Sequence, residues 1–434
     1  MKVTNELANF AVAPVAAEAA LAMMRLSLFD WAACAIAGRD EPVARIVRDM
    51  VLAEAGAGVA TVIGGGRAPA RGAALAGGTA SHALDYDDTH FDHIGHPSVA
   101  VIPAALAVAE QTGVDGAAFL EASLVGAELS IRLGVWLGRA HYQTGFHQTA
   151  TAGAFGATAA AGRLLRLSAD RMAHGLGLAA TRAAGLKSQF GTMGKPFNAG
   201  IAAATGVEAA LLAHAGFVSN PEALETEQGF GPTHAGEANA VALDGLGRSW
   251  RFETVSHKFH ACCHGTHAAI EAIGALRGRF DAATVEAVTI TVHPRWLRVC
   301  NIARPETGLQ AKFSYRLTAA MALSGWNTAA LESFSDAACR NPILSRLAGK
   351  IEVRTRPGLP ETAAEVTVRT PGRTVSEYHD LDAPMPMARR ASRLAAKAQS
   401  LLGAEAAGAL SEATRGDVDL VALCALLGAA SRPG

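Results

Sequence analysis

The chain has 434 residues, of which 50% are hydrophobic, and its 38 Lys and Arg residues nearly balance its 39 Asp and Glu residues. This length exceeds the roughly 250–300 residues at which a single hydrophobic core stops growing, so two domains are expected. The apolar content excludes a disordered chain. The formal net charge of −1 shows no basic excess of the kind that favours nucleic acids or membrane surfaces.

Most of the chain before residue 250 has the apolar spacing of helices, and strand-like alternation is nearly absent there. Abundant Ala and Gly suit helices that pack closely in a large core. Gly or polar residues separate the helical segments. The predicted helices are Ala16–Ala37, Ala100–Gln111, Gly116–Leu137, Gln148–Leu165, Ala169–Ala184 and Asn198–Ala215.

The pattern changes after about residue 253, where residues alternate with a period of two. The predicted strands are Val285–Val292, Ile351–Thr355, Ala364–Thr370 and Arg373–Tyr378, the last two joined by a turn at Pro371-Gly372. Between them, Ala311–Leu323 and Ala329–Ser335 have helical spacing. We therefore predict a mainly α fold with a large all-helical domain, 1–252 with 385–434, and a smaller α+β domain, 253–384.

Cellular location is predicted from the N-terminus and the cysteines. The first residues lack the basic-then-apolar pattern of a signal peptide, and the apolar run Val99–Ala109 is about half the ~20 residues that a membrane span needs. Six cysteines are scattered along the chain. A reduced, cytoplasmic protein without a membrane or nucleic-acid partner is therefore expected.

The stretch from His82 to Ser98 holds four histidines and four aspartates, although charged residues make up only 18% of the chain. Carboxylates and imidazoles placed this closely shift one another's pKa values, which is how enzymes obtain an acid and a base near neutral pH. The alternative is a solvated loop between helices, because the stretch has few apolar residues to bury.

Three further groups of residues are candidates for chemistry. His147 and Lys195 both lie at predicted helix starts, which suit anionic ligands, although a histidine that caps a helix and a surface lysine are the simpler interpretations. The third group, Cys262, Cys263, His264 and His267, suggests zinc, but adjacent cysteines fit one tetrahedral ion poorly and no second Cys-x-x-Cys pair completes a site. No nucleotide-binding motif is present, so no cofactor or metal is predicted.

Several motifs in one order resemble the MmgE/PrpD family over roughly residues 5–400. They are His82-Ala-Leu-Asp-Tyr-Asp-Asp-Thr89, His96-Pro-Ser98, Gly145-Phe-His147, Gly194-Lys-Pro-Phe-Asn198 followed by Glu208-Ala-Ala-Leu-Leu212, Thr266-His267 and Lys312-Phe-Ser-Tyr315. The resemblance implies an all-helical domain with a smaller α+β lid domain, an active site between them and a homodimer. It also implies an enzyme that acts on small polycarboxylates without a redox cofactor.

The resemblance further implies the residues of the site. Proton removal next to a carboxylate needs a base near the operating pH and cations that stabilise the developing enolate. His96 and His147 are the candidates for proton transfer and Lys195 for binding a carboxylate. Asp85 would orient an imidazole or act as the base. The other candidates are His264 and Tyr315 for catalysis, and Thr89, Asp88, Cys263 and His267 for substrate binding.

Three departures from the family pattern affect the expected reaction. When Thr266-His267 is the anchor, the catalytic histidine of the decarboxylases falls at Cys263, and His264 would replace it only if the backbone turned by one residue. Asp87 replaces the asparagine in the Asp-Phe-Asn-Asp-Thr stretch of 2-methylcitrate dehydratase, and the chain is shorter than expected for that enzyme.

Elimination of water from a hydroxy-polycarboxylate is the predicted reaction. Epimerisation of an iminodisuccinate-like substrate, cis-aconitate-type decarboxylation and a dimer that binds polycarboxylates without catalysis are the alternatives.

Overall fold

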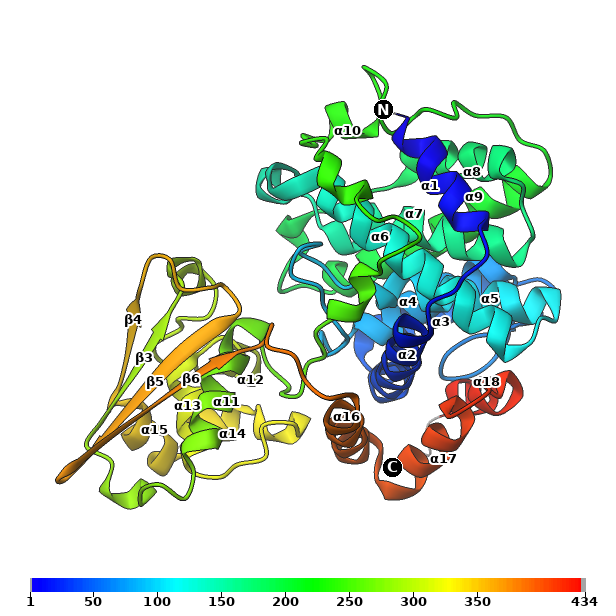
Figure 1. Ribbon diagram of the computed structural model, residues 1–434. Coiled ribbons are helices and arrows are strands. Elements are labelled where there is room, and N and C mark those ends of the chain that lie inside the picture. Colours follow the sequence, from blue (N-terminus) through cyan, green and yellow to red (C-terminus); the bar gives the residue numbers. More distant parts are fainter. Residues whose placement is uncertain (1, 431–434) are drawn as a thin grey trace. The chain divides into compact units, whose positions relative to one another are not determined.

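The computed structural model describes residues 2–430, which form two compact units. The first unit contains residues up to His257 and those from Leu402 onward, and the second contains Lys258–Leu401. Figure 1 shows the elements of each unit in the colours of the sequence. The fold is mainly helical, as predicted.

The first unit is built from helices. The six predicted helices are confirmed as α2, α5, α6, α7, α8 and α9, whereas α1, α3, α4 and the short hairpin of β1 and β2 were not predicted. The bounds are α1 Val3–Val12, α2 Glu18–Gly38, α3 Pro42–Glu54, β1 Ala60–Thr61, β2 Arg67–Ala68, α4 Ala70–His82, α5 Ser98–Thr112, α6 Gly116–Thr144, α7 Gln148–Leu164, α8 Ala169–Arg182, α9 Gly194–His214, α10 Phe230–Thr233, α17 Ala404–Thr414 and α18 Leu420–Gly428.

Helix α7 forms the centre of this unit, and α5, α6, α8 and α9 pack around it. Every residue of α7 except Arg163 is buried. Its sequence is rich in Ala, Gly and Thr, so neighbouring helices approach it closely. The loops at both ends of α7 are therefore held by a rigid core.

Two glycines let α4 and α9 approach each other, and this approach positions the candidate site. A Cβ atom on Gly78 would lie 2.9 Å from the carbonyl oxygen of Ala199, and one on Gly200 would lie 2.5 Å from that of Leu75. Any larger residue would push the helices apart. Because the contact lies one turn from the end of α4 and from the start of α9, it brings His82 near Lys195.

The second unit is a four-stranded sheet with helices packed on it. The strand order is β4-β3-β5-β6, with β3 parallel to β4 and the other neighbours antiparallel. All four predicted strands and the hairpin are confirmed, and the hairpin turns at Pro371-Gly372 in the register Thr370↔Arg373. The strands are β3 Ala287–Val292, β4 Ile351–Thr355, β5 Ala363–Thr370 and β6 Arg373–Asp380.

The helices of this unit differ in part from the prediction. The expected helix Ala311–Leu323 begins only at Tyr315, as α13, where Ser314 is the N-cap, and Ala311 is the last residue of the short helix α12. The expected helix at Ala329–Ser335 is only a 3₁₀ turn, Leu331–Ser333. Helices α11 and α13 pack against the sheet. The helical bounds are α11 His267–Leu276, α12 Gly308–Ala311, α13 Tyr315–Leu323, α14 Asp336–Cys339, α15 Pro342–Ala348 and α16 Met387–Leu402.

The unit boundaries fall at His257/Lys258 and Leu401/Leu402, not at 252/253 and 384/385. The boundary at Leu401/Leu402 lies later in the chain than predicted because α16 packs within the second unit. Arg393 on α16 forms an ion pair with Glu271 and lies 3.9 Å from the ring centroid of Phe259. The amphipathic spacing of this segment predicts a helix, but it does not indicate which core the helix covers.

Two helices of the first unit, α2 and α9, are long and apolar enough to cross a membrane. Their most apolar windows are 67% and 72% buried inside the unit. Such burial is typical of core helices.

Candidate functional site

The histidine- and aspartate-rich stretch forms the connection between α4 and α5. His82 is the last residue of α4 and Ser98 is the first residue of α5. Between them, the φ angle of Asp85 is 52°, in the left-handed region that residues other than glycine seldom adopt. This turn directs the side chains of Asp85 and Asp87 toward His82 and His96. A residue other than glycine with a positive φ angle is strained, and such strain is typical of functional loops.

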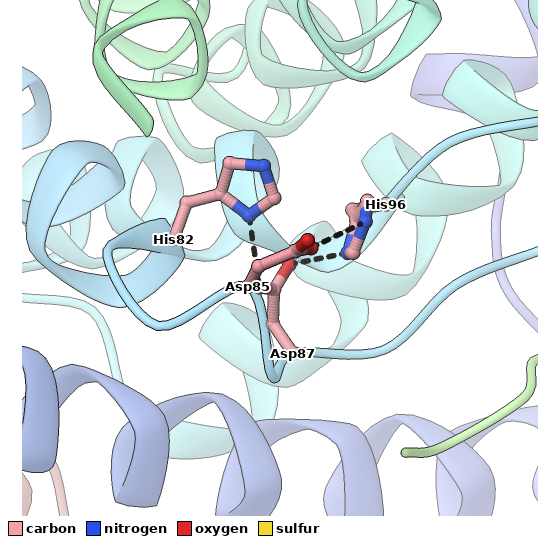
Figure 2. A group of neighbouring side chains, drawn as sticks. All are labelled: His82, Asp85, Asp87 and His96. Atoms are coloured by element: carbon pink, nitrogen blue, oxygen red, sulfur yellow. Dashed lines mark hydrogen bonds and ion pairs between the residues drawn. The ribbon is translucent and has the colours of Figure 1, made fainter. Parts of the chain in front are cut away.

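Asp87 joins two imidazoles at the base of this group, as Figure 2 shows. Its carboxylate oxygens lie 2.8 Å from Nδ1 of His82 and 2.8 Å from Nδ1 of His96, and all three residues are buried. Burial alone would raise the pKa of Asp87. The charges and hydrogen bonds of His82 and His96 outweigh burial and hold that pKa well below its usual value. Asp87 is therefore a carboxylate that fixes a proton on each facing Nδ1.

Asp85 connects this base to a lysine. Its two oxygens lie 3.3 Å from Nε2 of His96 and 2.7 Å from Nζ of Lys195, which is in the first turn of α9. The side chains of Asp85 and Lys195 are 36% and 16% exposed, whereas those of His82 and Asp87 are almost fully buried. Solvent therefore reaches the ammonium and one carboxylate first, with the imidazoles beneath them.

His147 precedes α7 and lies beside the same group. Its ring is stacked on that of His82 at 6.0 Å between centroids, and it is 2% exposed. Burial lowers the pKa of His147 well below its usual value, and the charges of Lys195, His82 and His96 lower it further. The imidazole is therefore neutral at neutral pH.

Asn198 decides which nitrogen of His147 carries the proton. Its Nδ2 atom lies 3.4 Å from the carbonyl oxygen of Leu186, to which it donates, and 3.3 Å from Nδ1 of His147. Because an amide nitrogen is only a donor, Nδ1 of His147 accepts and Nε2 carries the proton. His147 is therefore a neutral donor that can transfer a proton or stabilise an oxyanion.

Replacing Asn198 with alanine is expected to lower kcat about 10- to 100-fold with a small effect on KM, because the tautomer of His147 is no longer fixed. Steady-state kinetics measure both constants. Asn239→Ala, which removes a cap from the 3₁₀ segment Ala240–Leu243, is the matched control and should leave both constants unchanged. Equal kinetics for the two variants would contradict the assignment.

Asp88 and Thr89, predicted to bind substrate, have partners within the protein. Asp88 is 2% exposed and accepts a hydrogen bond of 2.6 Å from Oγ of Ser98 at the start of α5. The backbone N–H of Thr89 donates to the carbonyl oxygen of Ser256 at 2.9 Å, and its hydroxyl donates to the same oxygen at 3.3 Å. A role in substrate binding stays a prediction for both residues.

The stability of the protein should fall with rising pH because of Asp88. Burial raises the pKa of Asp88 to about 7, above its unfolded value of about 3.9. Its neutral form therefore stabilises the fold fully below pH ~4, and this contribution is lost as the pH rises through about 7, on the order of 4 kcal/mol in total. Asp88→Asn keeps a neutral group at every pH.

Thermal unfolding from pH 5 to pH 8 measures this effect. The Tm of Asp88→Asn should rise relative to that of the native chain as the pH increases. Parallel curves would show that Asp88 does not titrate in this range.

The second unit contains the other predicted residues, Cys263, His264, His267 and Tyr315. The hydroxyl of Tyr315 donates to the carbonyl oxygen of Gly265 at 2.7 Å, and burial raises the pKa of Tyr315 well above its usual value, so the phenol keeps its proton. The ring of His267 packs against that of His264 at 4.7 Å between centroids. These residues form a cluster within their own unit, and their catalytic roles stay predictions.

Among residues 2–430, one group of His, Cys, Asp and Glu side chains has ligand atoms that converge as a metal ion requires: His82, Asp85, Asp87 and His96. The Cys262–His267 segment does not supply such a group within that range. In the converging group, both oxygens of Asp87 face imidazoles and Asp85 is paired with an ammonium. This arrangement fits proton transfer better than a divalent cation.

The structure thus brings Asp85, His96, His147 and Lys195 together, although they are far apart in the chain. Sequence reasoning did not name His82, Asp87 or Asn198 as site residues. His82 and Asp87 lie inside the stretch that it identified, and Asn198 follows Lys195 by three residues, the spacing at which two residues share a helix face.

Comparison with known proteins supports a common origin. Residues 5–243 match the MmgE/PrpD N-terminal domain and residues 260–408 match the MmgE/PrpD C-terminal domain. The chain is 30% identical to a human cis-aconitate decarboxylase over 304 residues, which are 67% of this chain and 63% of that protein. It is 32% identical to the cis-aconitate decarboxylase of Aspergillus terreus over 269 residues, 58% of this chain and 55% of that protein. The matches thus span about three fifths of the length of these relatives.

Proposed function

This chain belongs to the MmgE/PrpD family. We propose that it is a lyase that acts on a small polycarboxylate and forms a carbanion, stabilised as an enolate, at the carbon next to a carboxylate. Decarboxylation of a cis-aconitate-like substrate is the reaction nearest to the named relatives. Dehydration, the reaction favoured by sequence motifs alone, becomes the second candidate.

One observation carries the proposal: an ammonium, two carboxylates and three imidazoles form one connected group in the first unit. Asp85 links Lys195 to His96, and Asp87 links His96 to His82. Such a group supplies a cation for a substrate carboxylate and several positions for one proton, which is the chemistry that these reactions share.

In decarboxylation, the bond between a carbon and its carboxylate breaks, CO₂ departs and the electron pair moves into the conjugated acid. A proton from the enzyme then joins carbon, so the product has one carboxylate fewer. Lys195 would bind a remaining carboxylate and stabilise the developing enolate. The Nε2–H of His147, or His96 between its two aspartates, would supply the proton.

A specific residue favours the second candidate. The position that the resemblance gives to the catalytic histidine of decarboxylases is Cys263 in this chain. A thiol is a weaker acid than an imidazolium, with an ordinary pKa of about 8.5 against about 6.5, so Cys263 would be a poorer proton donor than a histidine at this position. Dehydration removes a proton beside a carboxylate and releases the hydroxyl, with a second proton, as water, whereas epimerisation removes a proton and returns one to the opposite face. The imidazoles of the group in the first unit could serve as base and acid for either reaction without Cys263.

A panel of tricarboxylates, hydroxy-tricarboxylates and aminodicarboxylates offered to the purified protein tests the proposal. CO₂ release identifies decarboxylation, new ultraviolet absorbance without CO₂ identifies dehydration, and loss of optical rotation without either identifies epimerisation. Binding without turnover of any member would refute the lyase assignment and favour a polycarboxylate-binding protein.

A further inference from the structure

The loop 185–193, between α8 and α9, exposes three large apolar side chains next to an ionic site. Leu186, Phe190 and Met193 are 51%, 39% and 51% exposed. Exposed large apolar side chains are typical of a binding site for a ligand or a partner. The exposure of these three side chains contributes nothing to the hydrophobic core, and the ionic contacts of Lys195 and Asp85 do not require it.

This loop is fixed in place by α6 and α7. The N–H of Lys187 donates to the carbonyl oxygen of Gly145 at 2.8 Å, and its ammonium donates to that of Tyr142 at 2.9 Å. At the other side, the N–H of His147 donates to the carbonyl oxygen of Gly185 at 3.0 Å. Gly185 has a φ of 143° and leaves only 2.6 Å between its ideal Cβ position and that of Ala150, so no other residue fits there.

Phe190 is the loop residue that contacts the site. Its ring meets that of His147 edge to face, with 5.0 Å between centroids and an interplanar angle of 83°. Nζ of Lys195 lies 5.4 Å from the centroid of the same ring. The partly exposed ring of Phe190 therefore borders both the neutral proton donor and the ammonium.

We infer that Phe190 determines substrate specificity: its ring packs on the hydrocarbon part of the substrate between the carboxylates and favours a planar, unsaturated acid over its hydroxylated counterpart. This inference rests on the proposed function and names the substrate class for that same site. The carboxylates of such a substrate would lie at Lys195, and its flat carbon–carbon double bond would lie on the ring.

The physical reason is the cost of burying a hydroxyl without a partner. A planar alkene loses nothing when it packs on an aromatic ring, whereas a hydroxyl that faces Phe190 loses its hydrogen bonds to water. That loss disfavours the hydroxylated acid about 10- to 100-fold. Exclusion of water by the ring also strengthens the contacts of Lys195 with the carboxylates.

The test compares cis-aconitate with citrate, which both carry three carboxylates and differ by one water added across the double bond. Dissociation constants are measured by calorimetry for the native chain and for Phe190→Ala, Phe190→Leu and Val241→Ala. If an acid is turned over, its dissociation constant is measured by pre-steady-state binding, so that both acids are compared as dissociation constants in every variant. Val241 is 47% exposed on the 3₁₀ segment Ala240–Leu243, so its truncation is a matched control outside the loop.

The native chain and Val241→Ala should prefer cis-aconitate by at least about tenfold, and Phe190→Ala should reduce that preference to within about threefold. Phe190→Leu, which keeps an apolar but non-aromatic surface, should give an intermediate preference. An unchanged preference in Phe190→Ala, or a native preference for citrate, would overturn the inference while leaving the lyase assignment intact. If the native chain binds neither acid, the inference fails, whereas the proposed function fails only if no member of the panel is turned over.

Discussion

Lys195→Ala should lower kcat/KM by at least about 10³-fold, because it removes the cation that binds a substrate carboxylate and leaves the negative charge of Asp85, which still pairs with His96, to repel the substrate. Nζ of Lys195 is 2.7 Å from an oxygen of Asp85 and only partly exposed, so the lost interaction is poorly screened. Most of the loss should appear in KM. Steady-state kinetics with the substrate found in the panel measure the effect.

The control for this variant is Lys2→Ala. Lys2 also pairs with a carboxylate, 2.5 Å from Glu222, but its side chain is 69% exposed, so its removal should leave kinetics unchanged. Circular dichroism and thermal unfolding establish that Lys195→Ala is folded. His147→Ala, by contrast, should abolish turnover with the fold intact. A Lys195→Ala/His147→Ala double variant with near-normal turnover would refute the assignment of both residues.

Asp87→Asn should affect activity and stability together. The substitution removes the carboxylate that fixes a proton on His82 and on His96, so kcat should fall about 10²- to 10⁴-fold. It also leaves two buried imidazoles without their counter-charge, at a cost of about 3–5 kcal/mol. Kinetics and denaturant unfolding measure the two effects.

The pH dependence of stability distinguishes the charge of Asp87 opposite the two imidazoles from the packing of its side chain. The folded pKa of Asp87 lies well below its unfolded value, so its contribution to stability is present above pH ~4 and is lost as the pH falls through the folded pKa. The unfolding curves of the native chain and Asp87→Asn should therefore converge in acid.

Glu271→Gln serves as the matched control for Asp87→Asn. Glu271 also pairs with an imidazole, with 3.1 Å between its Oε1 and Nε2 of His260. This control should lose stability without a comparable loss of kcat. If its kcat falls as far as that of Asp87→Asn, the activity loss reports the fold and not the orientation of His96.

Local sequence patterns predicted much of the fold. Period-two alternation placed β3 to β6 almost to the residue, and Pro371-Gly372 set the hairpin register, because these signals act between neighbours in the chain. The histidine- and aspartate-rich stretch was identified for the same reason. Helices α3 and α4 were not predicted, and the boundary of the second unit was misplaced because α16 is held there by contacts with residues far away in the chain.

The sequence by itself determined most of the elements, the family resemblance and the residue types available for chemistry. Only the tertiary structure decided that adjacent Asp87 and Asp88 differ. Asp87 is a carboxylate between imidazoles, and Asp88 is a buried acid beside Ser98 whose pKa is raised to about 7. The tertiary structure also decided that Lys195 meets Asp85 and that Asn198 orients His147. The physical reason is that periodicity is a local property, whereas pairing and pKa depend on burial and on charges that the close approach of α4 and α9 brings together.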